Sequence, residues 1–319
     1  MSEYTEKLLI TGGAGFIGSN IAEYMLKIGW SVRILDNLST GHKSNIETLL
    51  KQYPKSCEFM HGDITNLEIC RKAMDSITII CHQAALGSVP RSIVDPLSSH
   101  LSNVNGQFNI LFAAKEAGIK RIVYASSSSV YGDSAELPKT ENNVGNPLSP
   151  YAVTKKINEL YGNIFSLTYG MECIGLRYFN VFGPKQDPNG VYAAVIPKFI
   201  DMIKQKQVPI INGDGQISRD FTYVDNVVNA NYLAMTTKNP ECFGKVFNIG
   251  NGGRITINEL YWEIAKQLNF DEEPVYGKVR DGDIQHSNAS IELANKNLGY
   301  EPKVSFKEGI RLTVQSYLQ

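Results

Sequence analysis

The sequence predicts an α/β protein with a doubly wound parallel sheet of the Rossmann type and a smaller C-terminal α/β domain. In the first 180 residues, short apolar runs alternate with segments of helical length. This alternation is typical of βαβ units, whose parallel sheet is buried on both faces. A glycine-rich turn joins the first apolar run to the first helix. Right-handed crossovers between the following units would wind the sheet to both sides.

The expected elements follow one another with short connections up to Asn180. Strands are expected at Leu8–Thr11, Val32–Leu35, Glu58–His61, Thr78–His82, Arg121–Ala125 and Cys173–Arg177, and helices at Phe16–Ile28, Lys43–Gln52, Leu67–Met74, Ile93–Ala117 and Tyr151–Tyr169. Later helices are expected at Ala193–Lys204, Asp225–Thr236, Ile257–Leu268 and Phe306–Ser316, and strands at Val208–Ile211 and Lys245–Ile249. We therefore expect a first domain over residues 1–180 and a second over 181–319. The segment 221–249 is expected to return to the first domain.

Composition excludes several classes of protein. The chain has 319 residues and a formal net charge of −1, so it has no overall basic field for nucleic acid or an anionic membrane. Its five cysteines are widely spaced without a C-x-x-C pair, which predicts buried thiols in a reducing compartment rather than a zinc site or disulfides. No apolar run approaches the ~20 residues of a membrane span, and the charged N-terminus does not resemble a signal peptide. These features predict a cytoplasmic protein without a metal site.

The first motif is the turn Gly12-Gly13-Ala14-Gly15-Phe16-Ile17-Gly18, which fits both G-x-G-x-x-G and G-x-x-G-x-x-G. Glycines let the backbone turn tightly and approach a pyrophosphate, whose charge then lies at the N-terminus of the following helix. The glycines could also serve only a strand–helix turn. The preceding strand and following helix of one βαβ unit favour a dinucleotide site.

Asp36 ends the second expected strand, 18 residues after Gly18. A carboxylate at this place accepts hydrogen bonds from the adenosine ribose hydroxyls and repels a 2′-phosphate, so it favours NAD over NADP. The alternative is a turn-forming aspartate before Asn37. Asp63 and Ile64 are expected to flank the adenine, with capping of the next helix as the alternative for Asp63.

The catalytic candidates are a tyrosine, a lysine and a serine. Tyr151 and Lys155 lie four residues apart behind Pro150, which suits the first turn of a helix, so they share one helix face. A nearby ammonium is expected to stabilise the phenolate of Tyr151 and lower its pKa from about 10. The run Ser126–Ser129 places hydroxyls at the carboxyl end of the preceding strand. Together with the glycine turn, these residues predict proton transfer beside a dinucleotide.

These motifs resemble the extended short-chain dehydrogenases/reductases through TGGAGFIG, the serine run before VYG, and YAVTK. DNLSTGHKSN, RYFNVFGPKQDPNG, INGDGQISRDFTYVDN and RDGDIQHS are similar to stretches of the nucleotide-sugar 4-epimerases, so the resemblance covers about residues 8–290. It implies tightly held NAD, regenerated in each turnover, a UDP-sugar substrate, and Ser127, Tyr151 and Lys155 as catalytic residues. The reaction it implies passes hydride from the sugar C4 to the nicotinamide and back through a transient 4-keto sugar.

Within that family, QAALGSVPRSIVDP and the four-serine run most resemble the UDP-N-acetylglucosamine 4-epimerases. In that group a small residue near the 2-position of the sugar leaves room for the N-acetyl group. The matching residue here is Ser287. The resemblance also implies that Gly87, Ser88, Ser128 and Ser129 contact the sugar.

The remaining expected contacts combine chemistry with this resemblance. Arg219 and Arg280 carry guanidinium groups that can grip diphosphate oxygens with paired hydrogen bonds, although Arg219 also fits a surface pair with Asp220. Asp283 is expected beside the uridine ribose. The full expected substrate set is Gly87, Ser88, Ser127, Ser128, Ser129, Asn180, Val195, Asn212, Arg219, Arg280, Asp283 and Ser287. The expected cofactor set is Gly12, Gly15, Phe16, Ile17, Gly18, Asp36, Asn37, Asp63, Ile64, Gln83, Ala84, Ala85, Asn103, Tyr151, Lys155 and Tyr178. Asn180 could instead be a loop former, and Asn103 a helix cap.

The resemblance implies a homodimer formed through the helices expected at Ile93–Ala117 and Tyr151–Tyr169. The apolar stripe of Val104, Phe108, Leu111 and Phe112 is by itself more typical of a core. Three alternatives to a UDP-N-acetylglucosamine 4-epimerase remain open from the sequence. UDP-glucose and UDP-glucuronate 4-epimerases share the reaction, and Arg91 could meet a carboxylate. A sugar 4,6-dehydratase needs an acid/base pair where this chain has two serines. A non-catalytic NAD-binding scaffold would not need the tyrosine–lysine pair.

Overall fold

The computed structural model describes residues 6–188, 194–278 and 285–318. Its centre is a seven-stranded sheet in the order β11-β6-β5-β4-β1-β2-β3, and all of its strand pairs are parallel. The strands are β1 (Lys7–Thr11), β2 (Ser31–Asp36), β3 (Cys57–His61), β4 (Ile79–His82), β5 (Arg121–Ser127), β6 (Glu172–Tyr178) and β11 (Val246–Ile249). The order reverses between β1 and β4, which confirms the doubly wound Rossmann-type sheet. In such sheets ligands bind beyond the carboxyl ends at this switch point.

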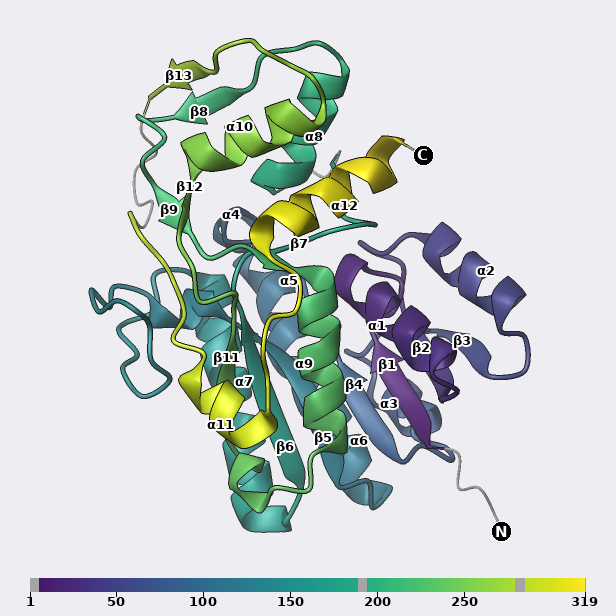
Figure 1. Ribbon diagram of the computed structural model, residues 1–319. Helices are drawn as coiled ribbons and strands as arrows, with labels where there is room; N and C mark the ends of the chain where they lie inside the picture. The colour runs from purple at the N-terminus through teal and green to yellow at the C-terminus, as the bar shows by residue number, and fades with distance from the viewer. Residues whose placement is uncertain (1–5, 189–193, 279–284, 319) are drawn as a thin grey trace.

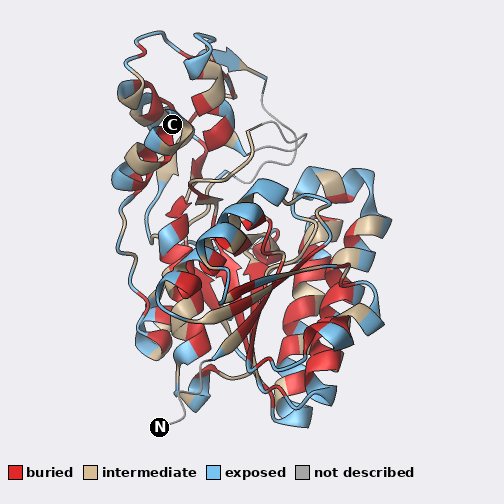
Figure 2. Cartoon of the chain, turned by 90° about the vertical axis from the view of Figure 1, so that its right-hand side faces the viewer, coloured by how far each residue is buried: buried red, intermediate tan, exposed pale blue. Residues whose placement is uncertain are grey.

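Alternate residues of each strand enter two separate cores. In β1, Leu8 and Ile10 belong to one buried cluster and Leu9 to the other. The first core is covered by α1 (Phe16–Lys27), α2 (Lys43–Gln52) and α9 (Val224–Thr236), and the second by α3 (Leu67–Ala73), α6 (Gly106–Glu116) and α7 (Pro150–Tyr169). Figure 2 shows the buried strands between these helices, whose outer surfaces are exposed. The near-continuous apolar runs in the sequence follow from this burial on both faces.

The prediction of a single helix at Ile93–Ala117 is wrong. The structure has α4 (Val89–Val94), α5 (Pro96–His100), a π-helical turn at Leu101–Asn105, and then α6. The break occurs because Pro96 cannot continue a helix and instead begins a new one. Asp95 caps that new start, its side chain accepting a hydrogen bond from the Ser98 backbone N–H at 3.0 Å.

The smaller domain packs over the carboxyl edge of the sheet, at the top of Figure 1. Its helices are α8 (Val195–Lys204), α10 (Ile257–Gln267) and α12 (Phe306–Leu318), and short strand pairs join β8 (Ile210–Asn212) to β13 (Val275–Gly277), β9 (Ser218–Arg219) to β12 (Ile255–Thr256), and β7 (Val181–Phe182) to β10 (Thr222–Tyr223). The remaining elements are α11 (Glu292–Leu298) and 3-10 turns at Ser128–Tyr131 and Pro240–Cys242. Between α8 and α10 the chain returns to the sheet, where α9 packs on α1 and β11 pairs with β6.

All five cysteines are buried and unpaired. Among the described residues, no helix is both long and apolar enough for a membrane span. The same residues contain no cluster of three or more histidine, cysteine or acidic side chains that could bind a metal ion.

Candidate active site

The glycine turn brings the start of α1 close to the end of β4. Gly12 has a φ of +71°, and a Cβ there would lie 2.7 Å from the backbone of Ala84. A Cβ on Gly18 would lie 2.2 Å from the carbonyl oxygen of Gly12. Both positions therefore require glycine. No side chain caps the first turn of α1 among the described contacts, so its N–H groups face the space beyond the sheet.

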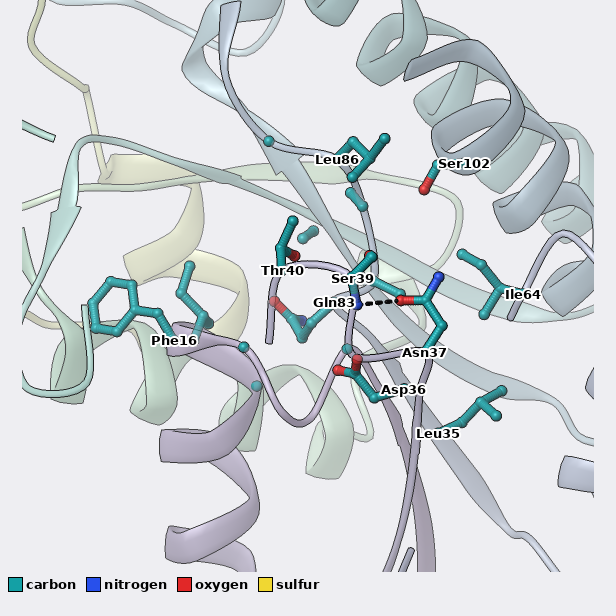
Figure 3. A pocket seen from close by; sticks show the side chains of 18 of the residues that line it. Phe16, Leu35, Asp36, Asn37, Ser39, Thr40, Ile64, Gln83, Leu86 and Ser102 are labelled. Carbon is teal, nitrogen blue, oxygen red and sulfur yellow. Dashed lines mark hydrogen bonds between the residues drawn. The ribbon is translucent and has the colours of Figure 1, made fainter. Parts of the chain in front are cut away.

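A cavity of about 380 Å³ begins at this turn and extends along the carboxyl edge of the sheet (Figure 3). Every residue of the expected cofactor set lines it except Asn103. The lining residues outside that set are Leu35, Ser39, Thr40, Gly62, Leu86, Gly87, Arg91, Ser102, Ala125 and Ser126. Ser39 and Thr40 lie shortly after Asp36, which ends β2. Their short distance in sequence from Asp36 could have indicated that they line the same cavity.

At one end of the cavity, Asp36 ends β2 and is buried. Its two carboxylate oxygens accept hydrogen bonds from the backbone N–H groups of Ala14 at 2.9 Å and Leu38 at 2.8 Å. Burial would raise the pKa of Asp63, but hydrogen bonds from Thr65 and Asn37 lower it overall. These bonds keep a carboxylate ionised at this end of the cavity. Asp63 does not cap α3, because Asn66 does so.

Gln83 and Tyr178 lie against α9. The Tyr178 hydroxyl donates to Gln83 Oε1 at 3.1 Å and accepts from Asn231 Nδ2 at 2.8 Å. Gln83 Nε2 donates to Asn231 Oδ1 at 3.2 Å. Asn231 therefore orients two residues of the cavity wall, although nothing in the local sequence of α9 indicated it.

The catalytic candidates meet where β5 ends and α7 begins. Ser149 caps α7, and Tyr151 and Lys155 both face the cavity. Lys155 is 4% exposed, donates from Nζ to the carbonyl oxygen of Ala125 at 2.8 Å, and lies 5.9 Å from the centroid of the Tyr151 ring. Ser127 is the last residue of β5, and its hydroxyl lies close enough to the Tyr151 phenol to influence the pKa of that phenol. The structure thus brings together three residues that span 29 positions of the sequence.

Burial shifts the pKa values of Tyr151, Lys155 and His82. It raises the pKa of Tyr151, an effect that the nearby Ser127 hydroxyl opposes. The sequence-based expectation of a lowered tyrosine pKa is therefore wrong for the protein alone, because removal from water disfavours the phenolate. Burial also lowers the pKa of Lys155 to about 8, with the charge of Glu159 opposing it. His82 stays neutral, because burial and the charge of Lys155 lower its pKa to about 3.

The serines after Ser127 have different roles in the structure. Ser128 and Ser129 begin the 3-10 turn, and the backbone N–H of Ser129 donates to Ser127 Oγ at 3.1 Å. The Ser129 hydroxyl is buried and has no hydrogen-bond partner among the described residues. Ser88 caps α4 through the backbone N–H of Arg91, and Gly87 lines the cavity beside it.

A second cavity, of about 630 Å³, lies in the smaller domain. Four expected substrate residues line it: Asn180, Val195, Asn212 and Arg219. Asn180 Nδ2 donates to the carbonyl oxygen of Asp220 at 3.0 Å, which ties it to the strand region carrying Arg219. The sequence did not indicate the apolar walls of this cavity, which include Phe199, Met202, Ile211, Ile217, Phe221 and Ile257.

Ser287, the residue expected beside the N-acetyl group, does not line either cavity. The backbone N–H of Ser287 donates to the carbonyl oxygen of Ser218 at 3.1 Å, which places Ser287 next to β9. Arg280 and Asp283 lie outside the described residues.

Asn103 is neither a cavity residue nor a helix cap. It lies inside the π-helical turn and is 1% exposed. Its side chain accepts from the backbone N–H of Leu86 at 2.7 Å and donates to the carbonyl oxygen of Leu86 at 3.1 Å and to Thr154 Oγ1 at 3.1 Å. Asn103 therefore fastens the cavity-lining segment after β4 to the catalytic helix.

A Rossmann-type sheet with a glycine turn, a serine at a strand end and a Tyr-x-x-x-Lys helix around one cavity defines an enzyme of the short-chain dehydrogenase/reductase type. The chain belongs to the NAD dependent epimerase/dehydratase family, whose model matches residues 8–250. Its relatives include a putative UDP-glucose 4-epimerase of Methanocaldococcus jannaschii, 40% identical over 309 residues, which are 96% of this chain and 97% of that protein.

Solved structures show the same fold over nearly the whole chain. The UDP-N-acetylglucosamine 4-epimerase of Methanobrevibacter ruminantium, in complex with UDP-N-acetylmuramic acid, is 37% identical with a TM-score of 0.92. The UDP-glucose 4-epimerase of Thermotoga maritima, with UDP-glucose, is 34% identical with a TM-score of 0.91. In both comparisons 98% of each chain is covered.

Proposed function

We propose that this protein is an NAD-dependent UDP-sugar 4-epimerase, an isomerase, and that its substrate is UDP-N-acetylglucosamine, which it interconverts with UDP-N-acetylgalactosamine. The observation that carries the proposal is that Tyr151 and Lys155 line a cavity that begins at the glycine turn, with Ser127 beside Tyr151 at the end of β5. This arrangement puts a proton acceptor next to the place where a dinucleotide would lie.

The cavity residues fit NAD. Gly12 and Gly18 permit the tight turn, because a Cβ at either position would collide with neighbouring backbone. Gly12, Gly15 and Gly18 line the cavity at the start of α1, where a pyrophosphate would lie. Asp36 and Asp63 bring two carboxyl groups to the adenosine end, which favours ribose hydroxyls over a 2′-phosphate. Gln83, Lys155 and Tyr178 would then surround the nicotinamide end.

The protein's own groups account for the proton transfers. Tyr151, as phenolate, takes the proton of the sugar's 4-hydroxyl while Ser127 donates a hydrogen bond to the same oxygen. Because burial raises the pKa of Tyr151, the phenolate needs positive charge nearby, which the ammonium of Lys155 provides. When bound, NAD supplies reversible acceptance of the hydride from C4 of the sugar. After the 4-keto sugar has rotated so that its other face lies toward the cofactor, Tyr151 returns the proton to the 4-oxygen.

The second cavity is proposed to hold the UDP part, with Asn180, Val195, Asn212 and Arg219 from the described chain and with Arg280 and Asp283. Ser287, next to β9, is proposed to be the small residue beside the N-acetyl group of the sugar. Gly87, Ser88, Ser128 and Ser129 are proposed to face the sugar. The Methanobrevibacter ruminantium structure, which is named for the N-acetylated substrate, supports this choice of sugar.

UDP-glucuronate is the second candidate, and the other alternative is UDP-glucose, which carries a neutral hydroxymethyl group in place of the carboxylate. Arg91 lines the first cavity near Gly87 and Tyr151, where a guanidinium could meet a sugar carboxylate. A UDP-glucuronate 4-epimerase of Thermodesulfobacterium geofontis is 33% identical over 96% of this chain.

Product analysis of the purified protein on UDP-N-acetylglucosamine, UDP-glucose and UDP-glucuronate tests the function. We expect epimerisation without added oxidant, fastest on the N-acetylated sugar, and a loss of at least about a hundredfold in Tyr151→Phe. Tyr169→Phe, at the half-exposed end of the same helix, is the matched control and should retain activity. Faster turnover of another sugar would overturn the choice of substrate, and full activity of Tyr151→Phe would overturn the mechanism.

We also propose a homodimer. Exposed apolar side chains follow α4, α5, the π-helical turn, α6 and the adjoining α7: Ile93, Val94, Leu97, Leu101, Phe108, Val153, Leu160, Ile164 and Leu167. Such a surface is typical of an interface between subunits. Within the stripe expected to be core, Val104 and Leu111 are buried, but Phe108 is 37% exposed. Sedimentation should give twice the 35.4 kDa chain mass, and a monomer would refute the proposal.

A further inference from the structure

A buried ion pair lies beneath the catalytic helix and has no part in the proton transfers above. Arg177 on β6 contacts Glu159 on α7 with Nε–Oε1 at 2.7 Å and Nη2–Oε2 at 2.9 Å. Arg177 is 2% exposed and Glu159 6%. A buried ion pair is weak evidence for stability, because desolvation offsets the attraction. Its contacts point to another role.

Glu159 links the catalytic helix to the catalytic strand. Spacing of four residues puts it on the same face of α7 as Tyr151 and Lys155. Glu159 Oε1 accepts a hydrogen bond from Ser126 Oγ at 2.7 Å, and Lys155 Nζ donates to the carbonyl oxygen of Ala125 at 2.8 Å. Two successive turns of α7 therefore hold two successive residues of β5, directly before Ser127.

Arg177 extends the connection to the serine turn. It lies opposite Ser126 in the register of β5 and β6. Its Nη1 donates to the Tyr131 hydroxyl at 3.0 Å, and that hydroxyl donates to Asn248 Oδ1 on β11 at 2.6 Å. Tyr131 ends the 3-10 turn that begins at Ser128. The ion pair thus joins α7, two strands and the turn that follows Ser127.

We propose that Glu159, held by Arg177, is a positioning residue that acts through Ser126 to fix Ser127 against Tyr151. The inference rests on the proposed epimerase function. Ser127 and Tyr151 come from different elements, so contacts between β5 and α7 contribute to the distance between their hydroxyls. Small displacements of reacting groups lower the rate steeply, by about a hundredfold for 1 Å.

Ser126→Ala is the main test, because it removes the link to β5 and leaves the ion pair intact. We expect kcat to fall about tenfold with KM within about twofold, and the melting temperature to stay near that of wild type. Ultraviolet difference titration against Tyr151→Phe should show a changed phenol titration, since the Ser127 contact to Tyr151 loosens. Unchanged kcat, or a change in KM alone, would overturn the proposal.

Glu172→Gln is the matched control. Glu172 pairs with Arg121 at 2.6 Å across the same two strands, but at their amino ends. Loss of that pair should leave kcat and the phenol titration unchanged. An equal loss of kcat in this variant would overturn a specific role for Glu159, because it would reflect the strand pair in general.

Glu159→Gln adds a charge-specific readout. The groups facing Lys155 are Glu159 on its own helix, Tyr151, and His82 on β4, which is neutral. Without the carboxylate, Lys155 should lose its proton more easily, so the alkaline limb of the kcat profile should move to lower pH. If the alkaline limb of the kcat profile stays at the same pH, the proposed electrostatic effect of Glu159 on Lys155 is overturned. If this variant fails to fold, Ser126→Ala alone decides. If wild type epimerises none of the sugars, the proposed function fails, but the phenol titration still tests the positioning of Tyr151.

Discussion

The buried Lys155 should lower the free energy of unfolding near neutral pH, and Lys155→Met should raise it. The side chain is 4% exposed, and burial lowers its pKa to about 8 from 10.5. At about 1.36 kcal/mol per pH unit, this difference corresponds to about 3 kcal/mol. Below pH 8 both the folded and unfolded states carry the proton, so the folded state bears the full cost of a buried ammonium.

The sign of the pH dependence follows from proton binding. Between about pH 8 and 10.5 the unfolded chain keeps the Lys155 proton while the folded protein releases it, so this group makes unfolding free energy rise with pH. Methionine removes the cost but also the hydrogen bond to Ala125, worth about 1 kcal/mol. Lys155→Met should therefore be about 2 kcal/mol more stable than wild type near neutral pH. The advantage should disappear as pH approaches 10.5.

Urea unfolding of both proteins, stripped of cofactor, across this pH range measures the difference directly. Comparison of the two cancels the contributions of other groups whose pKa differs between the folded and unfolded states, among them Tyr178, whose pKa burial raises far above 10. The variant should also lose epimerase turnover, which separates its stability from its activity. A stability difference that is independent of pH, or a variant that is less stable near neutral pH, would refute the reasoning.

Two further substitutions test the shape of the cofactor cavity. Gly18→Ala should lose about 1–2 kcal/mol of unfolding free energy and bind NAD more weakly, because its Cβ would lie 2.2 Å from the Gly12 oxygen. Gly253→Ala is the control. Its Cβ would meet nothing within 4 Å, so its unfolding free energy should change by less than about 0.5 kcal/mol. Equal effects of the two in urea unfolding and NAD titration would contradict the close approach. Asn103→Ala should lose about 1–3 kcal/mol and weaken NAD binding, because the Leu86 N–H loses its buried acceptor. An unchanged NAD affinity in this variant would show that the hydrogen bonds between Asn103 and Leu86 do not contribute to NAD binding.

Much of the fold and the cofactor site could be predicted from local patterns. Helix and strand periodicity, the glycine turn and the Tyr151–Lys155 spacing are properties of short segments, and each forms through contacts with neighbouring residues or with an adjoining βαβ unit. For the same reason, fifteen of the sixteen expected cofactor residues line the first cavity. The exception is Asn103, which does not line the cavity because its side chain binds the backbone of Leu86 in a different segment.

Only the tertiary structure decided what depends on burial and on contacts between distant segments. The direction of the Tyr151 pKa is one example, since spacing shows the nearby lysine but not the loss of water around the phenol. The link from Glu159 through Arg177 and Tyr131 to Asn248 is another, because it joins four elements that are separate in the chain. The sequence by itself determined which groups are present and how each segment folds. Their distances and their ionisation depend on packing, because packing alone sets how much water surrounds each group and which groups meet.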